Sequence, residues 1–323
     1  MIKNQWYGIL PSKELKKEKL VAVKRCGLDL CLFRLNDDSI GCVIDQCTHR
    51  GAAISKGKNK GDCIACPFHG IQFDKEGKTV FVPANGKLAH VEERFNVKSY
   101  LVKEAHGMVY FWYGDKDKVT DDLPYFEEFL KEGMVYSEMS DCWNAHYSCC
   151  IENQLDVVHV PFVHYNTIGR GNKTLVNGPA LKVEGNTIIF SAYNSLDEGQ
   201  PQIPASELTV NPNMNLRFKF PNVWQNHISS HMNVVIFFAP IDDEHTMFYI
   251  LFYTDMFKLR FMNQLMAAVG KRMNKVIERQ DKGVVETQRP KVSALFCGEH
   301  LLKGDSPVIT YRKMRDDFQK KED

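Results

Sequence analysis

The sequence contains Cys47-Thr48-His49-Arg50-Gly51 and, after a further Lys/Gly-rich stretch, Cys66-Pro67-Phe68-His69-Gly70. The pattern is Cys-x-His, sixteen intervening residues, and Cys-x-x-His. Each motif ends in glycine, which lets the chain bend sharply and brings backbone N–H groups close to a bound group. We predict that the two segments are loops that together hold one metal centre.

Two cysteines and two histidines divided between two loops form the ligand set of a Rieske [2Fe–2S] cluster, in which two histidines replace two cysteines on one iron. We therefore assign Cys47, His49, Cys66 and His69 as cluster ligands. A zinc site is the alternative, because Cys63-x-x-Cys66 has ribbon-like spacing. Zinc ribbons pair two such motifs, however, and this sequence has only one. Zinc would also leave one histidine without a role.

The composition is that of an ordinary globular protein. At 323 residues the chain is long enough for two domains. Its 41 Lys and Arg balance 40 Asp and Glu, so no strong field favours nucleic acid or an anionic membrane. Ten cysteines are too few for a disulfide scaffold and are expected to be thiols or metal ligands in a reducing compartment. The chain start lacks signal-peptide character, and no run approaches the ~20 apolar residues of a bilayer span. We expect a cytoplasmic protein.

The first part of the chain is predicted to be all-β. Between residues 21 and 113, short apolar runs alternate with turn signals such as Asn36-Asp37-Asp38 and Ala84-Asn85-Gly86, which is typical of a small barrel or sandwich. The polar segment Gly114–Lys118 interrupts this pattern. We therefore divide the chain into residues 1–115 and residues 116–323.

The second part is predicted to be an α+β domain. Residues 144–166 have helical character, strand patterns follow from about 180 to 255, and residues 257–288 form one long helix with apolar residues at near-helical spacing. These apolar residues are Phe261, Leu265, Ala268, Met273 and Ile277. An antiparallel sheet that grips the long helix is the simplest assembly. The charged tail 315–323 is expected to be frayed.

A second constellation lies in the segment Asn153–His164. On a helix Asp156 and His159 share a face, and Pro161 should end or kink that helix and so bring His164 round to the same ion. Two histidines and one carboxylate with open positions form the facial triad of non-haem Fe(II) oxygenases. We favour Asp281, on the long helix, as the carboxylate; Glu278 or Glu286 on the same helix are alternatives.

Together these residues resemble the oxygenase component of Rieske non-haem iron oxygenases, the aromatic-ring-hydroxylating α-subunit family. The resemblance rests on residues 47–52, 66–70 and 153–164, and on Gln280-Asp281 with Gln288-Arg289-Pro290. It implies an all-β Rieske domain followed by a helix-grip (START-like) catalytic domain, with His159, His164 and Asp281 on a mononuclear Fe(II). It also implies a head-to-tail homotrimer in which the cluster of one subunit serves the iron of the next.

The same resemblance implies a role for Asp156. It matches a bridging carboxylate between a cluster histidine, by position His69 of the partner subunit, and the iron ligand His159. Asn153 is expected to lie close behind the iron ligands. Ile71 departs from the family, in which an aromatic residue often occupies this position. The chain is also short, which makes it similar to stand-alone homotrimers that perform O- or N-demethylation and related monooxygenations.

These points lead to one expected function. The chain is expected to be a terminal oxygenase that receives electrons from a separate reductase, with or without a ferredoxin, and uses O₂ to hydroxylate or demethylate a small apolar or aromatic substrate. No GxGxxG pattern is present, so NAD(P)H would act only through the reductase. Two alternatives remain: a Rieske electron carrier without oxygenase activity, and a zinc-stabilised binding protein. Candidate substrate-pocket residues are Phe162, Trp224, Asn226, His227, Val235, Phe237, Phe252 and Met256.

Overall fold

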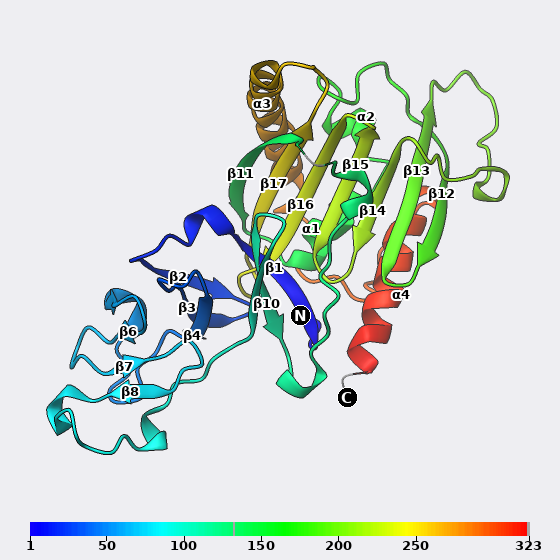
Figure 1. The fold of residues 1–323 in the computed structure, drawn as a ribbon. Coiled ribbons are helices and arrows are strands. Elements are labelled where there is room, and N and C mark those ends of the chain that lie inside the picture. The colour runs from blue at the N-terminus through cyan, green and yellow to red at the C-terminus, as the bar shows by residue number, and fades with distance from the viewer. Residues whose placement is uncertain (132, 322–323) are drawn as a thin grey trace. The chain divides into compact units, whose positions relative to one another are not determined.

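A computed structural model describes residues 1–131 and 133–321 of the chain (Figure 1). It divides into two compact units. The first comprises Lys3–Leu123 with Met1 and the short segment Pro240–Asp242, and the second comprises Pro124–Ala239 and Asp243–Asp323 with Ile2. Each unit has its own sheets and is described separately.

The first unit is all-β, as predicted. One antiparallel sheet has the order β1 (Gln5–Pro11), β10 (Met108–Tyr113), β9 (Val102–Ala105). A second has the order β2 (Leu20–Arg25), β3 (Leu28–Arg34), β4 (Ile40–Ile44). A third has the order β5 (Lys58–Asn59), β6 (Ile64–Ala65), β7 (Gln72–Phe73), β8 (Thr79–Phe81). The side chains of Cys47 and Cys66 are part of a buried cluster with Phe33, Ile54 and Phe73, so the two motif loops are fixed to a rigid core.

The second unit is built on one antiparallel sheet. Its seven strands have the order β11 (Val135–Trp143), β17 (Thr246–Thr254), β16 (Met232–Pro240), β15 (Val223–Ser229), β14 (Asn215–Lys219), β13 (Thr187–Ser195), β12 (Leu175–Glu184). β16 and β17 are almost continuously buried, which explains their unbroken apolar sequence. β11 was not predicted, because its sequence alternates polar and weakly apolar residues without a strong strand signal.

Four helices accompany this sheet (Figure 1): α1 (Tyr147–Leu155), α2 (Val160–Val163), α3 (Arg260–Val285) and α4 (Ser306–Lys320). The predicted helix over residues 144–166 is therefore two helices. The break comes earlier than expected: α1 ends at Leu155, Asp156 has an extended conformation, and Pro161 lies in the first turn of α2. Proline is well tolerated there because its missing N–H would have no partner in a first turn.

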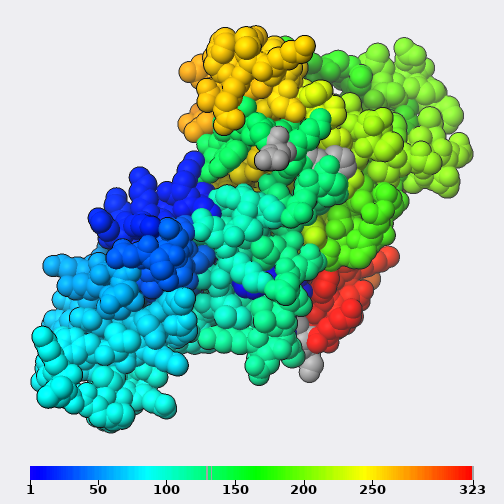
Figure 2. Space-filling model, in the orientation of Figure 1, coloured from blue at the N-terminus to red at the C-terminus, as the bar shows by residue number. Residues whose placement is uncertain are grey.

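The long helix α3 packs against β11 and β17, but with an unexpected face. Phe261, Leu265 and Met273 are 64%, 66% and 55% exposed, and the gold N-terminal part of α3 lies on the surface in Figure 2. The buried face instead carries small residues such as Ala267 and Gly270. A Cβ on Gly270 would lie 2.5 Å from the ring of Phe252. The close approach of helix and sheet, rather than the apolar periodicity, thus decides which face is buried.

The end of the chain is also more ordered than predicted. The tail expected to be frayed lies largely in α4, where Tyr311, Arg312 and Arg315 are buried, and only its residues 322–323 lie outside the described part. The guanidinium of Arg312 donates two hydrogen bonds to Glu152 of α1, at 2.9 and 2.8 Å. A bidentate pair of this kind is geometrically specific. α4 packs against β12 and β13 and so completes the second unit.

Within the described residues, no helix is both long enough and apolar enough to cross a bilayer.

Candidate metal centres and adjoining cavity

The two cysteine–histidine loops of the first unit have the same backbone geometry. Cys47 N–H donates to Ala52 O and Gly51 N–H donates to Cys47 O, both at 2.8 Å. The second loop repeats these bonds, from Cys66 N–H to Ile71 O and from Gly70 N–H to Cys66 O. Gly51 and Gly70 have φ values of 73° and 72°, a left-handed conformation that glycine adopts without steric cost. The predicted role of these two glycines is therefore visible in the structure.

The side chains of the four motif residues separate into two pairs. Cys47 and Cys66 are 2% and 3% exposed, whereas His49 and His69 are exposed, with their Nδ1 atoms 3.1 Å apart. Two imidazole nitrogens this close are suited to share one ion. Burial raises the pKa of the Cys47 thiol, but the backbone N–H groups of His49 and Arg50 donate to its sulfur and act in the opposite direction. Such bonds stabilise a thiolate ligand. The donor set thus fits a two-iron cluster with its histidine edge at the surface.

The same separation argues against zinc. A tetrahedral zinc needs four donor atoms around a single point. Among the described residues, the single set of three or more such donors within 4.8 Å of one another is His159, His164 and Asp281, so the four motif residues do not gather in this way. Cys63, the other residue of the ribbon-like motif, places its sulfur 3.3 Å from Gln72 Oε1, and burial raises its pKa to about 11. Cys63 is therefore a buried, protonated thiol.

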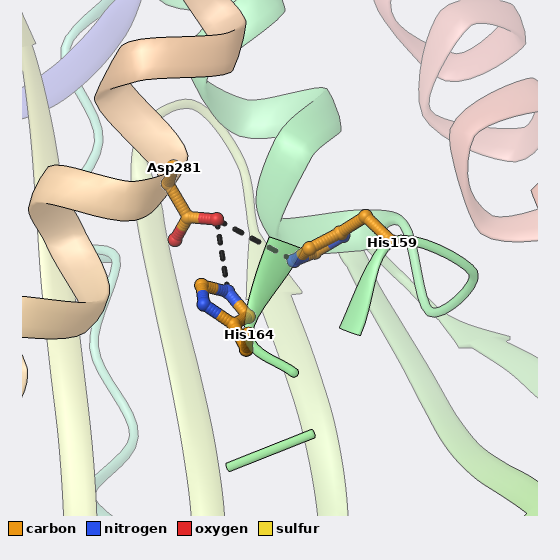
Figure 3. A group of neighbouring side chains, drawn as sticks. All are labelled: His159, His164 and Asp281. Atoms are coloured by element: carbon orange, nitrogen blue, oxygen red, sulfur yellow. Dashed lines mark ion pairs between the residues drawn. The ribbon is translucent and has the colours of Figure 1, made fainter. Parts of the chain in front are cut away.

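The second unit brings together His159, His164 and Asp281 (Figure 3). Asp281 Oδ1 lies 3.0 Å from His164 Nε2 and 3.5 Å from His159 Nε2. The histidines flank α2, and the aspartate projects from the last turns of α3. Both imidazoles face the Asp281 carboxylate because the chain breaks between α1 and α2, and not because of a kink at Pro161.

Neighbouring side chains orient two of these groups. His164 Nδ1 lies 2.9 Å from Gln280 Oε1, which also accepts a hydrogen bond from Thr167 Oγ1. A proton on Nδ1 leaves Nε2 with a free lone pair that faces Asp281. Gln154 Nε2 donates to Asp281 Oδ2 at 3.4 Å, which leaves Oδ1 for the shared point. Gln154 and Thr167 were not identified from the sequence. For Thr167 the available signal was a hydroxyl side chain three residues after His164.

Asp156 lies behind His159. Its Oδ1 accepts a hydrogen bond from Val158 N–H at 2.6 Å, and its Oδ2 lies 3.2 Å from His159 Nδ1. Asp156 is thus adjacent to His159 although the two do not share a helix. Asn153, in the last turn of α1, has a buried Nδ2 without a partner and lines the same region as Asp156.

These residues fit a divalent iron. Asp281 Oδ1 is buried and makes no hydrogen bond, which is a costly state for a carboxylate oxygen unless a cation binds it. Ligands in neighbouring octahedral positions, at ~2.1 Å from an ion, lie about 3 Å apart, close to the distances found here. Burial lowers the pKa of His164, but the Asp281 carboxylate outweighs this effect and raises it overall. A metal ion binds the unprotonated imidazole and would therefore compete with this protonation.

The alternative carboxylates are occupied elsewhere. Glu278 Oε1 accepts a hydrogen bond from Trp143 Nε1, and Glu286 Oε1 accepts one from Asn144 N–H. Burial, together with the neighbouring Asp141 carboxylate, raises the pKa of Glu278 to about 7. Neither glutamate is among the donors gathered around the two histidines.

A cavity of about 220 Å³ opens beside the three candidate ligands. Its wall on the sheet consists of residues that alternate along three strands, and helix α3 closes the opposite side with Asn274, Ile277 and Glu278. The sheet residues include Ile228, Val234, Ile236, Phe248 and Ile250. Most of the wall is therefore apolar, as is usual for a small-molecule site.

The cavity contains two of the eight pocket residues expected from the sequence, Trp224 and Asn226. His227, Val235 and Phe237 do not line it because neighbouring strand residues point to opposite faces. Phe252 lies further along β17, against Gly270. Phe162 and Met256 do not line the cavity and are 60% and 45% exposed. The sequence predicted where the strands lie but not which of their alternating residues face the cavity.

Comparison with known proteins agrees with this arrangement. Residues 5–100 match the Rieske [2Fe-2S] domain family, and residues 143–320 match the vanillate O-demethylase oxygenase C-terminal domain family. The second match covers more than half of the 323 residues. The chain belongs to the Rieske oxygenase family. The Rieske oxygenase resemblance and the fold class inferred from the sequence are thereby confirmed.

Individual relatives of this Rieske oxygenase are distant. The vanillate O-demethylase oxygenase subunit of Pseudomonas sp. (strain HR199 / DSM 7063) is 29% identical over 198 residues, covering 59% of this chain and 52% of that protein. Protein TIC 55 of Pisum sativum, a chloroplastic protein, is 27% identical over 226 residues, covering 69% of this chain and 39% of that protein. The matches thus span about half or less of these curated relatives.

A solved structure shares the fold over nearly the whole chain. NdmA of Pseudomonas putida CBB5 superimposes with a TM-score of 0.82 and 20% identity, covering 99% of this chain and 91% of that one. At this level of identity the likeness concerns the fold. It shows that the all-β unit and the helix-accompanied sheet occur together in a known structure.

Proposed function

We propose that this chain is the terminal oxygenase component of a multicomponent Rieske system, which hydroxylates or oxidatively demethylates a small, largely apolar substrate. The observation that carries the proposal is the presence of two separate ligand sets in one chain. Residues before the polar segment at 114–118 would hold the cluster through Cys47, His49, Cys66 and His69. Residues after it would hold Fe(II) through His159, His164 and Asp281, beside an apolar cavity.

Side chains around this cavity would prepare it for the reaction. Gln280 would fix the His164 imidazole through its hydrogen bond, and the Asp156 carboxylate, 3.2 Å from His159 Nδ1 but without a hydrogen bond to it in this structure, would attract the Nδ1 proton of His159, so that both Nε2 atoms face the shared point. Gln154 would hold the Asp281 carboxylate so that one oxygen remains available. The apolar wall would place a substrate C–H bond beside that point and exclude water. Asn153 lines the same region as Asp156, and its buried Nδ2, which lacks a partner, would be available there as a hydrogen-bond donor.

The overall reaction consumes O₂, two electrons and two protons, converts a C–H bond to C–OH and releases water. When bound, the cluster relays the electrons and the ferrous ion provides the O₂ chemistry. A hydroxylated O- or N-methyl group collapses to formaldehyde and the free hydroxyl or amine. The electrons would come from a separate reductase, with or without a ferredoxin.

Asp156 is proposed to connect the two centres between subunits of a head-to-tail homotrimer. Its side chain is 29% exposed and lines a second, polar cavity as well as the one that contains the iron ligands. The imidazoles of His49 and His69 are exposed and available to a partner. A hydrogen bond from His69 of the partner subunit would reach the Asp156 carboxylate from the polar side. The ten cysteines are all outside disulfide bonds, which supports a reducing compartment, and we propose the cytoplasm.

The experiment that tests the activity is reductase-coupled O₂ uptake with a panel of methoxylated, N-methylated and aromatic compounds. Formaldehyde and incorporation of ¹⁸O from ¹⁸O₂ would be measured in the same reactions. We expect product-linked O₂ consumption that is lost in Asp281→Ala. A protein that is reduced and reoxidised by its partner but forms no product with any compound would instead be an electron carrier.

A further inference from the structure

We propose that the cavity beside His159, His164 and Asp281 binds a neutral, largely apolar substrate that carries a hydrogen-bond acceptor, such as a carbonyl or ether oxygen, and that it rejects carboxylates. This inference rests on the proposed oxygenase function and specifies its substrate class. It is not a property of the family name, since vanillate, after which the matched domain family is named, is a carboxylate.

The charged side chains that line the cavity indicate which substrate charge it can accept. The ionisable acids among them are Asp156, Glu278 and Asp281. Within the described part of the chain, no lysine or arginine lines this cavity. Arg289 and Arg312 line the separate polar cavity, which Asp156 also borders. A buried carboxylate is strongly destabilised unless a cation or several donors meet it. A substrate carboxylate would find no cation among these side chains, and the neutral amides of Asn226 and Asn274 would offer it only uncharged donors.

A bound ferrous ion would not make the cavity favourable for a carboxylate. The two positive charges of a ferrous ion would be matched by the carboxylates of Asp281 and Asp156. Asp281 Oδ1 would contact the ion directly, and Asp156 lies 3.2 Å from a ligand imidazole. The site as a whole would then be close to neutral, before Glu278 is counted. An anionic substrate would thus gain little from the ion.

Glu278 also does not favour a cationic substrate. Its Oε1 accepts the indole N–H of Trp143, and its carboxyl group interacts with Asp141, which pairs with Lys282 at 2.9 Å. Burial and Asp141 raise the pKa of Glu278 to about 7, so that much of it is uncharged near neutral pH. A carboxyl group with these partners offers no free counter-charge to an ammonium group. Neutral substrates are therefore preferred over both charged classes.

Trp224 identifies the polar feature that the substrate should carry. Trp224 is 6% exposed and lines the cavity, and its indole Nε1 is buried without a hydrogen-bond partner. Buried N–H groups are rarely left unsatisfied in folded proteins. Tryptophan is a donor only, so the missing partner must be an acceptor. The N–H itself is closed off from the cavity in this structure, so a substrate oxygen would satisfy it once a small shift of the wall exposed it, while the apolar body of the substrate contacts Ile236 and Ile250.

The test uses isosteric probes that differ in charge. Benzamide, benzoate and benzamidine, with their 4-methoxy and 2-naphthyl counterparts, would be titrated by calorimetry into the purified holoprotein under anaerobic conditions without reductase. We expect each amide that binds to do so at least tenfold more tightly than its carboxylate, and no less tightly than its amidine. Carboxylates that bind as tightly as their amides, or a panel in which no amide binds, would overturn the proposal.

Two variants separate the cavity from adventitious binding. Trp224→Phe keeps an aromatic ring but removes the N–H, and should weaken amide binding about three- to tenfold, the usual contribution of one neutral hydrogen bond. Asn226→Arg adds a cation to the same wall and should reverse the preference in favour of benzoate. An unchanged amide affinity in Trp224→Phe, or an unchanged preference for the amide in Asn226→Arg, would overturn the proposal. Iron content and the visible spectrum of each variant, measured in parallel, report on the oxygenase assignment independently of ligand charge.

Discussion

His164 Nδ1 lies 2.9 Å from Gln280 Oε1, and the opposite nitrogen of the same ring lies 3.0 Å from Asp281 Oδ1. Two adjacent residues of α3 thus contact the two sides of one imidazole, 116 and 117 residues away in the chain. Gln280 accepts the Nδ1 proton and so leaves Nε2 with its lone pair toward the carboxylate. The geometry of the candidate iron site therefore depends on a residue that would not itself touch the metal.

Replacement of this residue should weaken metal binding without preventing folding. In Gln280→Leu the His164 ring loses its acceptor, and we expect the affinity for Fe(II) or Co(II) to fall about 10- to 100-fold. Competition with a chromophoric chelator measures this affinity. Arg279→Gln, at the exposed neighbouring position, serves as the control and should bind metal as the wild type does. Equal affinities in both variants would show that Gln280 does not orient the ligand.

The two cysteines of the Cys63-x-x-Cys66 motif should respond differently. Cys66→Ser should abolish the visible absorption of the cluster, because a thiolate ligand is lost. Cys63→Ser should retain it, since the thiol of Cys63 interacts with Gln72 and its pKa is raised to about 11. Absorption spectra and acid-labile sulfide distinguish the two outcomes. Loss of metal in both variants would instead favour the zinc interpretation.

Asp156→Asn tests the proposed connection between centres. The variant retains the Val158 N–H bond and the shape of the site but loses the charge beside His159 Nδ1. We expect normal iron and sulfide contents together with at least a tenfold loss of product formation. Single-turnover experiments that follow cluster oxidation would locate the loss in electron transfer. Full turnover in this variant would exclude Asp156 from the bridging role.

Glu278 should make stability depend on pH. Its pKa is raised from the ordinary 4.5 to about 7 in the folded chain, so the folded state holds this proton more tightly than the unfolded state. Its contribution is fully present below about pH 4.5, is lost as the pH rises toward 7, and changes little above that. The expected loss across this window is about 3 kcal/mol. Urea unfolding of wild type and Glu278→Gln at several pH values measures it; parallel pH profiles for the two proteins would contradict this assignment.

Much of the fold was predictable because its signals are local. The Cys-x-His and Cys-x-x-His loops, the all-β character of residues 21–113 and the helix at Arg260–Val285 each follow from short patterns in the sequence, whereas β1 (Gln5–Pro11) lies before the predicted region. β11 and α4 were not predicted. β11 lacks a clear alternation, and α4 is held by buried contacts, such as the Arg312–Glu152 pair, that join residues far apart in the chain.

Part of the candidate site could be predicted from the sequence for the same reason. His159 and His164 lie close together in sequence, and the structure brings Asp281 to them. The cavity residues could not be predicted from the sequence. Both faces of β16 are buried, so the apolar pattern does not show whether Val234 or Val235 faces the cavity. The exposed stripe of α3 shows the same limit: periodicity predicted a helix, but small residues at Ala267 and Gly270 decided its buried face.

The central claim is that one chain holds both a two-iron cluster and a separate iron. Quantitative iron and acid-labile sulfide analysis of the purified protein tests it most directly, with Asp281→Ala measured alongside. We predict three irons and two sulfides per chain in the wild type, and two irons with two sulfides in the variant. A wild-type protein with two irons that does not change on loss of Asp281, or one that contains zinc without sulfide, would contradict the account.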